Sequence, residues 1–249
     1  MILMFNVNVI KKIDYKCSSL KKLQMFFKTL LNTIRENRYF FIPLLLFYCF
    51  AIYRISIYSK IDNHLFFNQF VGNPFVDSIF KYLTYLGDGF FVVFIALIWS
   101  MKNLRQSLIL LITYGIAGGL VGILKNYVFD VPRPHFVFDY FHKDIFVKYV
   151  EGVEVLALNS FPSGHSTAAM VLFTCFAFYF SNPAMKFLMS ILGILVAFSR
   201  VYLSQHWIND ITAGTFIGWS ITFIFYTLEK YYHWFENLNH PIRYFFKKK

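Results

Sequence analysis

Long apolar runs separated by short polar segments dominate this chain. Six of the runs carry few or no charges and are long enough, or nearly so, to cross the ~30 Å hydrocarbon core of a bilayer as α-helices. They cover residues 39–53, 80–99, 108–127, 166–180, 187–203 and 211–228. The sequence therefore predicts an all-α integral membrane protein with six transmembrane helices in one bundle.

A different periodicity precedes the first run. Apolar residues recur there at steps of three and four positions, with lysines between them, at Leu20, Leu23, Phe27, Leu30 and Ile34. This pattern is typical of a basic amphipathic helix that lies on an anionic leaflet, and a helix that binds a protein partner is the alternative. We therefore expect a cytoplasmic or interfacial segment at 1–38, a six-span domain at 39–230 whose first span is an uncleaved anchor, and a basic cytoplasmic tail at 231–249.

Composition and charge agree with this topology. Of the 249 residues, 57% are hydrophobic, more than the roughly half that is usual in a soluble domain. A net charge of +11 would suit a nucleic-acid-binding protein, but sixteen of the 24 basic residues lie at the two ends of the chain and in two short loops on the same side of the membrane. The positive-inside rule assigns that side to the cytoplasm. The charge thus follows from membrane orientation, and no nucleic-acid partner is expected.

The remaining stretches have individual interpretations. Residues 56–79 are predicted to be too irregular for a span and to form an outer interfacial segment. Residues 86–89 are predicted to form a turn or kink near the outer end of the second span, with Asp88 as a surface carboxylate or a minor partner of an outer basic residue. Residues 135–161 form a long outer loop, rich in Phe and Tyr, that would act as a lid over a lipid headgroup. Small residues at helical spacing in the third span predict close helix packing, and they are Gly115, Gly118, Gly119 and Gly122.

The most informative polar residues lie between the last two spans. If the segment from Trp207 onward is helical, His206 and Asp210 stand four residues apart and face the same side. The aspartate can then accept the proton of one imidazole nitrogen and leave the other nitrogen free as a nucleophile. A helix-capping network at the membrane interface is the alternative interpretation of these residues alone.

Topology brings further polar residues to the same outer face. Lys125 ends the third span, Arg133 follows between two prolines, and Arg200 ends the fifth span. Before the fourth span, the turn Ser163-Gly164-His165 offers the free N–H groups of a helix start, which bind anions. A plain N-cap and an interfacial histidine would explain this serine and histidine taken singly. Three cations, an anion-binding turn and two histidines at one face predict a site for a phosphate group.

These residues form a series that resembles the three-part signature of the type 2 phosphatidic acid phosphatase (PAP2) family of membrane lipid phosphatases. The second and third motifs, at 162–165 and 199–210, match in full. The first departs, because seven residues separate Lys125 from Arg133 where the family usually has six. The similarity spans roughly residues 86–218 and leaves out the N-terminal segment.

The resemblance implies a mechanism that needs neither metal nor cofactor. His206 would attack phosphorus to form a phosphohistidine, Asp210 would orient it, and His165 would protonate the leaving lipid oxygen and then activate water. The phosphoryl oxygens would be held by Lys125, Arg133, Ser163, Gly164 and Arg200. One histidine must be neutral and the other charged, which predicts a bell-shaped dependence of activity on pH.

The predicted function is thus release of phosphate from a lipid headgroup at the periplasmic face of a bacterial inner membrane. Lipid A 1-phosphate and undecaprenyl diphosphate are the first substrates to test. A lipid phosphotransferase that uses the same phosphohistidine is one alternative, and a non-catalytic membrane protein that binds anionic lipid is another. Anionic inner-leaflet lipids are the expected partners of the N-terminal helix, and the sequence leaves the oligomeric state open.

Overall fold

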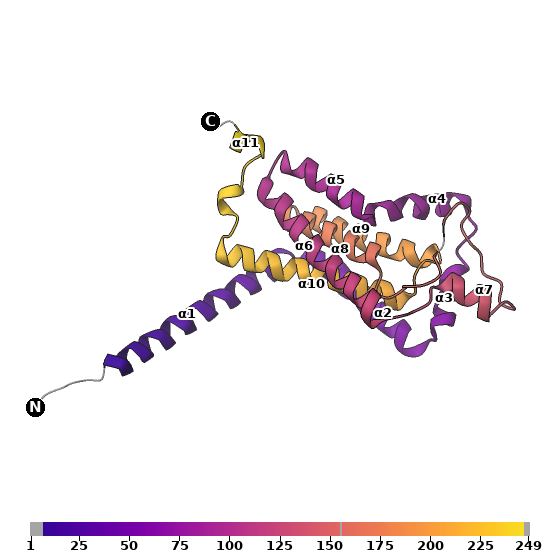
Figure 1. Cartoon of the computed structure of the whole chain (residues 1–249), viewed down its shortest axis with the longest axis horizontal. Helices are drawn as coiled ribbons and strands as arrows, with labels where there is room; N and C mark the ends of the chain where they lie inside the picture. Colours follow the sequence, from indigo (N-terminus) through magenta and orange to yellow (C-terminus); the bar gives the residue numbers. More distant parts are fainter. Residues whose placement is uncertain (1–6, 155, 247–249) are drawn as a thin grey trace, which may run out of the picture.

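The computed structural model describes residues 7–154 and 156–246, and within these ranges it contains helices and no β-strand. The long helices run beside one another as one bundle (Figure 1). They are α2 (Arg38–Ile57), α5 (Gly89–Ser100), α6 (Leu104–Ile123), α8 (Gly164–Tyr179), α9 (Pro183–Tyr202) and α10 (Ile208–Tyr232). The prediction of an all-α fold is confirmed.

Helix α8 is the centre of the bundle. It packs against α6, α9 and α10 and buries twelve of its 16 residues. Two glycines of α10 permit this contact, because a Cβ atom at Gly214 would lie 2.5 Å from the carbonyl oxygen of Ser163, and one at Gly218 would lie 2.5 Å from that of Thr167. The close approach fixes the start of α8 against the start of α10.

Four helices are each long and apolar enough to cross a membrane: α2, α6 with its extension η2 (Leu124–Val128), α9 and α10. A bent pair passes the same test as one unit, formed by α4 (Pro74–Leu83) with η1 (Thr84–Gly87) on one side and α5 on the other, with an angle of 61° between its halves. Helix α8 has 16 residues, about 24 Å at 1.5 Å per residue, and is shorter than a usual span. Four to five spans are supported, and the prediction of six is not confirmed.

The segment 56–79 is better ordered than its composition predicts. It contains α3 (Lys60–Asn68) and the first part of α4, and each helix has a side-chain cap, from Ser59 and Asn73 respectively. The segment is therefore mostly helical, although α3, with nine residues, is too short for a span. The kink predicted at 86–89 is present, and Asp88 caps α5 there by accepting from the N–H of Phe90 at 2.8 Å.

The glycine row of α6 does not serve close helix packing, so that prediction is also wrong. A Cβ atom would meet nothing within 4 Å at Gly115, Gly118, Gly119 or Gly122. Gly118 and Gly122 instead line an open groove of about 330 Å³ between α6, the η1–α5 junction and α8, whose walls also include Lys125 and His165. Spacing alone cannot distinguish a helix contact from a groove wall.

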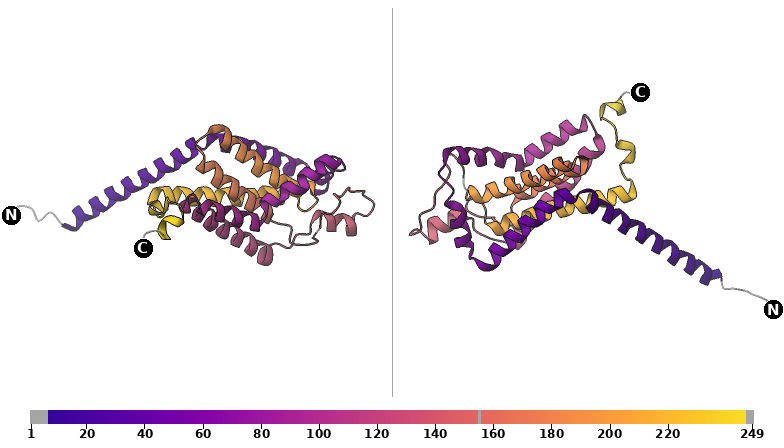
Figure 2. Two further views of the ribbon diagram at one scale, coloured as in Figure 1. Left: turned by 90° about the horizontal axis from the view of Figure 1, so that it is seen from above. Right: turned by 180° about the vertical axis from the view of Figure 1, so that it is seen from behind.

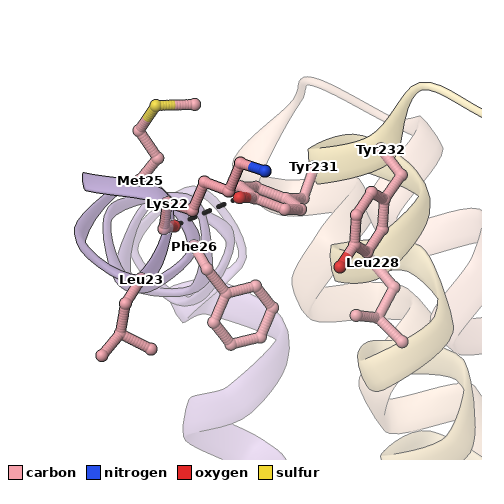
Figure 3. Close-up of a pocket in the computed structure, with 7 residues that line it drawn as sticks. All are labelled: Lys22, Leu23, Met25, Phe26, Leu228, Tyr231 and Tyr232. Atoms are coloured by element: carbon pink, nitrogen blue, oxygen red, sulfur yellow. Dashed lines mark hydrogen bonds between the residues drawn. The ribbon is translucent and has the colours of Figure 1, made fainter. Parts of the chain in front are cut away.

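The two ends of the bundle differ in character. Helices α1 (Val7–Glu36) and α11 (Arg243–Phe246), the first and last that the structure describes, lie toward one end of the bundle, and α3 and α7 (Pro134–Phe141) lie at the other (Figures 1 and 2). Helix α1 projects obliquely away from the bundle, and beyond α10 the chain continues through η3 (Glu236–Leu238) and α11. Where α1 meets α10 the two helices form a pocket, and the hydroxyl of Tyr231 donates there to the carbonyl oxygen of Lys22 at 3.1 Å (Figure 3).

Candidate active site

Helices α9 and α10 are joined by a tight turn that carries His206. The carbonyl oxygen of Arg200 accepts from the N–H groups of both Gln205 and His206, at 2.9 and 3.1 Å. Ser204 has a φ of 55°, in the left-handed region that residues other than glycine seldom adopt and that recurs at functional sites. The turn buries His206, whose exposed fraction is 1%.

His206 and Asp210 lie in contact, as their four-residue spacing predicts. Nδ1 of His206 is 3.3 Å from Oδ2 of Asp210, which also accepts from the N–H of Trp207 at 3.0 Å. Because a carboxylate can only accept, Nδ1 carries the proton and Nε2 keeps its lone pair. Burial, and then the charges of Arg133 and Arg200, lower the pKa of His206 well below its usual range, so the neutral form prevails at neutral pH.

Ser160 completes this group, although no sequence signal singled it out. Its Oγ donates to Oδ2 of Asp210 at 2.5 Å and lies 3.4 Å from Nδ1 of His206. Ser160 is fully buried, and its N–H donates to the carbonyl oxygen of Val131 at 2.8 Å. The outer loop therefore contributes directly to the site. The one hint in the sequence is that Ser160 stands just before the second motif.

Two arginines converge on the side chain of Gln205, which the sequence analysis also missed. Oε1 of Gln205 accepts from Nη1 of Arg133 at 3.2 Å and from Nη2 of Arg200 at 3.4 Å. Its Nε2 donates to the carbonyl oxygen of Glu154 at 2.6 Å. One amide oxygen thus bridges the two guanidinium groups. Because this oxygen is neutral, it does not balance their positive charges.

Lys125 reaches the site from η2, a single π-helical turn at the end of α6. The N–H of Phe129 donates to the carbonyl oxygen of Leu124 at 2.9 Å, a five-residue step that accommodates one residue more than an α-helical turn. This wide turn lies at the start of the seven-residue gap between Lys125 and Arg133. Nζ of Lys125 donates to the carbonyl oxygen of Asn159 at 2.9 Å.

The turn before α8 has the geometry of an N-cap. Oγ of Ser163 accepts from the N–H and the hydroxyl of Ser166, at 3.3 and 2.8 Å, and the N–H of Ser163 donates to the carbonyl oxygen of Asp210 at 3.1 Å. The hydroxyl therefore serves the helix, which is the alternative that the sequence left open. The N–H groups of Gly164 and His165 have no hydrogen-bond acceptor within the described ranges and suit an anion.

His165 lies at the accessible edge of the site. Its Nε2 is 3.9 Å from Oδ2 of Asp88, and the two side chains are 36% and 37% exposed. Asp88 is thus a partly exposed carboxylate, as predicted, and it also lies beside a basic residue of the site. His165 lines both the glycine groove and a second cavity of about 270 Å³, which it shares with Arg200 and Gln205.

The structure brings together all eight residues predicted for the site. The basic side chains around His206 are those of Arg133, Arg200, Lys125 and His165, and the Ser163–Gly164 turn is joined to them through Asp210. In the described part of the chain, no cluster of three or more His, Cys, Asp or Glu side chains is arranged to hold a metal ion. The catalytic and phosphate-binding roles of the eight residues stay predictions.

Known proteins resemble parts of this chain. It is 28% identical over 156 residues to the undecaprenyl-diphosphatase BcrC of Bacillus subtilis, covering 62% of this chain and 75% of that protein. It is 31% identical over 110 residues to the lipid A 1-phosphatase of Rhizobium etli, covering 44% of this chain and 45% of that protein. The crystal structure of Aquifex aeolicus LpxE superposes with a TM-score of 0.59 at 21% identity, covering 69% of this chain and 98% of that one, and thus shows the same fold.

The PAP2 superfamily profile matches residues 106–234. This region is more than half of the chain and contains every one of the eight site residues, from Lys125 to Asp210. We conclude that the chain belongs to the PAP2 superfamily.

Proposed function

We propose that this protein is a lipid phosphatase that works through a phosphohistidine. The observation that carries the proposal is the buried His206–Asp210 pair, which lies among the cationic side chains of Lys125, Arg133 and Arg200. A neutral imidazole with a free Nε2 is a nucleophile, and the cations attract the anionic group that it attacks. The phosphatase activities named for BcrC and for the Rhizobium relative support this reaction class.

The reaction has two steps in this proposal. Nε2 of His206 forms a bond to phosphorus while the bond from phosphorus to the lipid oxygen breaks, and His165 gives that oxygen a proton. Asp210 stabilises the positive charge that develops on the ring of His206. A water molecule then attacks phosphorus, His165 takes its proton, the N–P bond breaks, and inorganic phosphate leaves. The dependence of activity on pH should have two limbs, since one histidine must be neutral and the other protonated.

The three cations and the start of α8 would hold the phosphoryl oxygens. Lys125, Arg133 and Arg200 supply the positive charge that Mg²⁺ supplies in many phosphoryl-transfer sites, so the proposed reaction is independent of metal. The N–H groups of Gly164 and His165 add two neutral donors at a helix N-terminus. The Ser163 hydroxyl acts indirectly, because it fixes this turn.

We also propose a topology of six crossings, with the bent pair as one span and α8 as another. The basic chain ends would be cytoplasmic, and the site would face the periplasm of a bacterial inner membrane. Exposed apolar residues of α1, such as Leu23 and Phe27, alternate with lysines, which suits contact with anionic lipids of the inner leaflet. The pocket between α1 and α10, with Lys22 at its rim (Figure 3), adjoins this surface.

The test is phosphate release by the purified protein in detergent, with EDTA present. The panel contains lipid A 1-phosphate, undecaprenyl diphosphate, phosphatidylglycerophosphate and phosphatidic acid, and a His206→Asn variant runs in parallel. Release that survives EDTA and is lost in the variant supports the proposal. Release only after addition of an acceptor lipid would indicate a phosphotransferase. No turnover by the wild type would favour the non-catalytic alternative.

A further inference from the structure

Beside the predicted phosphate site lies a polar cavity that is lined mostly by residues other than the eight site residues. It has a volume of about 270 Å³ and lies between α4, η1 and the loop 151–154. It shares His165 and Arg200 with the phosphate site. Its other polar side chains come from outside the three motifs or from positions without an assigned role, and they include Lys81, Thr84, Tyr85, Asp88 and Gln205.

The loop that closes the cavity is held by two residues of its lining. Nζ of Lys81 donates to the carbonyl oxygen of Glu151 at 2.8 Å, and Nε2 of Gln205 donates to the backbone carbonyl oxygen of Glu154 at 2.6 Å. Gly152 lies between these two points with a φ of 69°, and a Cβ atom there would lie 2.6 Å from Nζ of Lys81. The left-handed conformation therefore calls for glycine. The loop brings its backbone directly over an ammonium group.

The cavity has an excess of donors toward its inner end. Arg200 and Lys81 are the two cationic residues of its lining, and one of the three N–H groups of Lys81 is used in the hydrogen bond to Glu151. The hydroxyl of Thr84 accepts from Arg200 at 2.7 Å and can donate its own proton. Of the two carboxylates, Asp88 faces His165, and Glu154 is exposed. An anion inside the cavity would find donors on several sides.

His165 connects this cavity to the reaction. If His165 protonates the leaving oxygen, the leaving group must extend into one of the two spaces that His165 lines, the glycine groove or this cavity. A hydrocarbon group in this cavity would remove water from Lys81, Arg200 and Asp88 without replacing its hydrogen bonds, which is unfavourable. A phosphate group would instead replace that water with charge-assisted hydrogen bonds.

We propose that this cavity is a subsite for the second phosphate of a lipid diphosphate, and that Lys81 is a specificity-determining residue. The proposal rests on the phosphatase function proposed above. His206 would attack the terminal phosphorus, and the anhydride bond to the bridging oxygen would break. The bridging oxygen would leave with the electron pair as part of a lipid monophosphate, held between Lys81 and Arg200. Water would then convert the phosphohistidine to inorganic phosphate.

The experiment measures kcat/KM of the full chain in detergent on farnesyl diphosphate, farnesyl monophosphate and phosphatidylglycerophosphate. Lys81→Gln keeps a donor for the loop but removes the charge, and Lys81→Arg keeps both. We expect the wild type to prefer the diphosphate over the monophosphate by at least about tenfold. Lys81→Gln should reduce this ratio by about tenfold, the size of one charge-assisted hydrogen bond, and Lys81→Arg should preserve it. Lys143→Gln is the matched control, because Lys143 is an exposed lysine of the outer loop and is not part of the cavity.

The proposal is overturned if Lys81→Gln lowers kcat/KM equally for all three lipids, because the lysine would then support the site in general. It is also overturned if the wild type prefers the monophosphate or phosphatidylglycerophosphate. Absence of phosphate release from every lipid by the wild type would refute the phosphatase function itself, so the two failures are distinguishable.

Discussion

The negative charge of Asp210 can be removed with little change in the geometry around it. Its Oδ2 contacts three donors, which are the hydroxyl of Ser160, the N–H of Trp207 and Nδ1 of His206, whereas Oδ1 has no partner within the described ranges. In Asp210→Asn the amide oxygen should take the place of Oδ2, because an NH₂ group there would face three donors. His206 then keeps its tautomer and loses only the charge beside it.

The size of the effect follows from the distance between the two groups. His206 becomes positively charged as its Nε2 bonds to phosphorus, and Oδ2 of Asp210 lies 3.3 Å from its Nδ1. With an effective dielectric constant of ~20, the attraction is about 5 kcal/mol. At roughly 1.4 kcal/mol per tenfold in rate, its loss corresponds to at most three to four orders of magnitude. We expect kcat to fall about a thousandfold, since neighbouring dipoles recover part of this energy.

Single-turnover release of phosphate from a lipid that the wild type hydrolyses measures this effect separately from substrate binding. Thermal unfolding in the same detergent shows whether the variant folds. Asp139→Asn is the control, because Asp139 is a partly exposed carboxylate of the outer loop, and it should keep the wild-type rate. A folded Asp210→Asn protein with a kcat within tenfold of the wild type would refute the electrostatic role of this carboxylate.

Three further perturbations probe features that the motifs do not contain. Ser160→Ala should lower kcat by about tenfold or more, because it removes a hydrogen bond to a charged group; an unchanged single-turnover rate would contradict this role. Deleting Asn126 should convert η2 into a regular α-helical turn and keep phosphate release within about tenfold, whereas deleting Gly118 should rotate Lys125 by about 100° and abolish it. Burial lowers the pKa of His64 from 6.5 to about 4. Between these pH values the unfolded chain binds a proton that the folded protein does not, so the free energy of unfolding should decrease by up to about 3 kcal/mol as the pH falls through this window. Thermal unfolding of His64→Phe at pH 7 and 4.5 should show a smaller decrease than the wild type.

Hydrophobic patterning predicted the long helices because each has a continuous apolar stretch to bury or to expose to lipid. It failed in the segment 56–79, where α3 and α4 are short and aromatic and their ends are defined by the single caps Ser59 and Asn73. It also misjudged the glycine row of α6. Residues at helical spacing identify one face of a helix, but what lies opposite that face depends on tertiary packing.

Six of the eight site residues were predictable because ionisable side chains near span ends are costly and seldom occur there without a role. The other two, Ser163 and Gly164, were predictable from the helix start that they form before the fourth span. Ser160 and Gln205 carry no such signal, since neutral polar residues are ordinary in an outer loop. Their positions matter only through contacts made in the fold. Ser160 is hydrogen-bonded to Asp210, which lies 50 positions away in the sequence, and Gln205 to Arg133, which lies 72 positions away.

The π-helical turn at η2 has a consequence for how such proteins are recognised and how they diverge. An inserted residue in an α-helix turns everything beyond it by about 100°, so most insertions beside a functional side chain would be selected against. A π-helical turn can hold one additional residue locally, so that the register of α6 up to Lys125 and the direction of the chain beyond the turn are both kept. The number of residues between the lysine and the arginine thus depends on whether the helix ends in an α-helical or a π-helical turn. Searches that demand a fixed gap would overlook chains like this one, and allowing one additional residue would recover them.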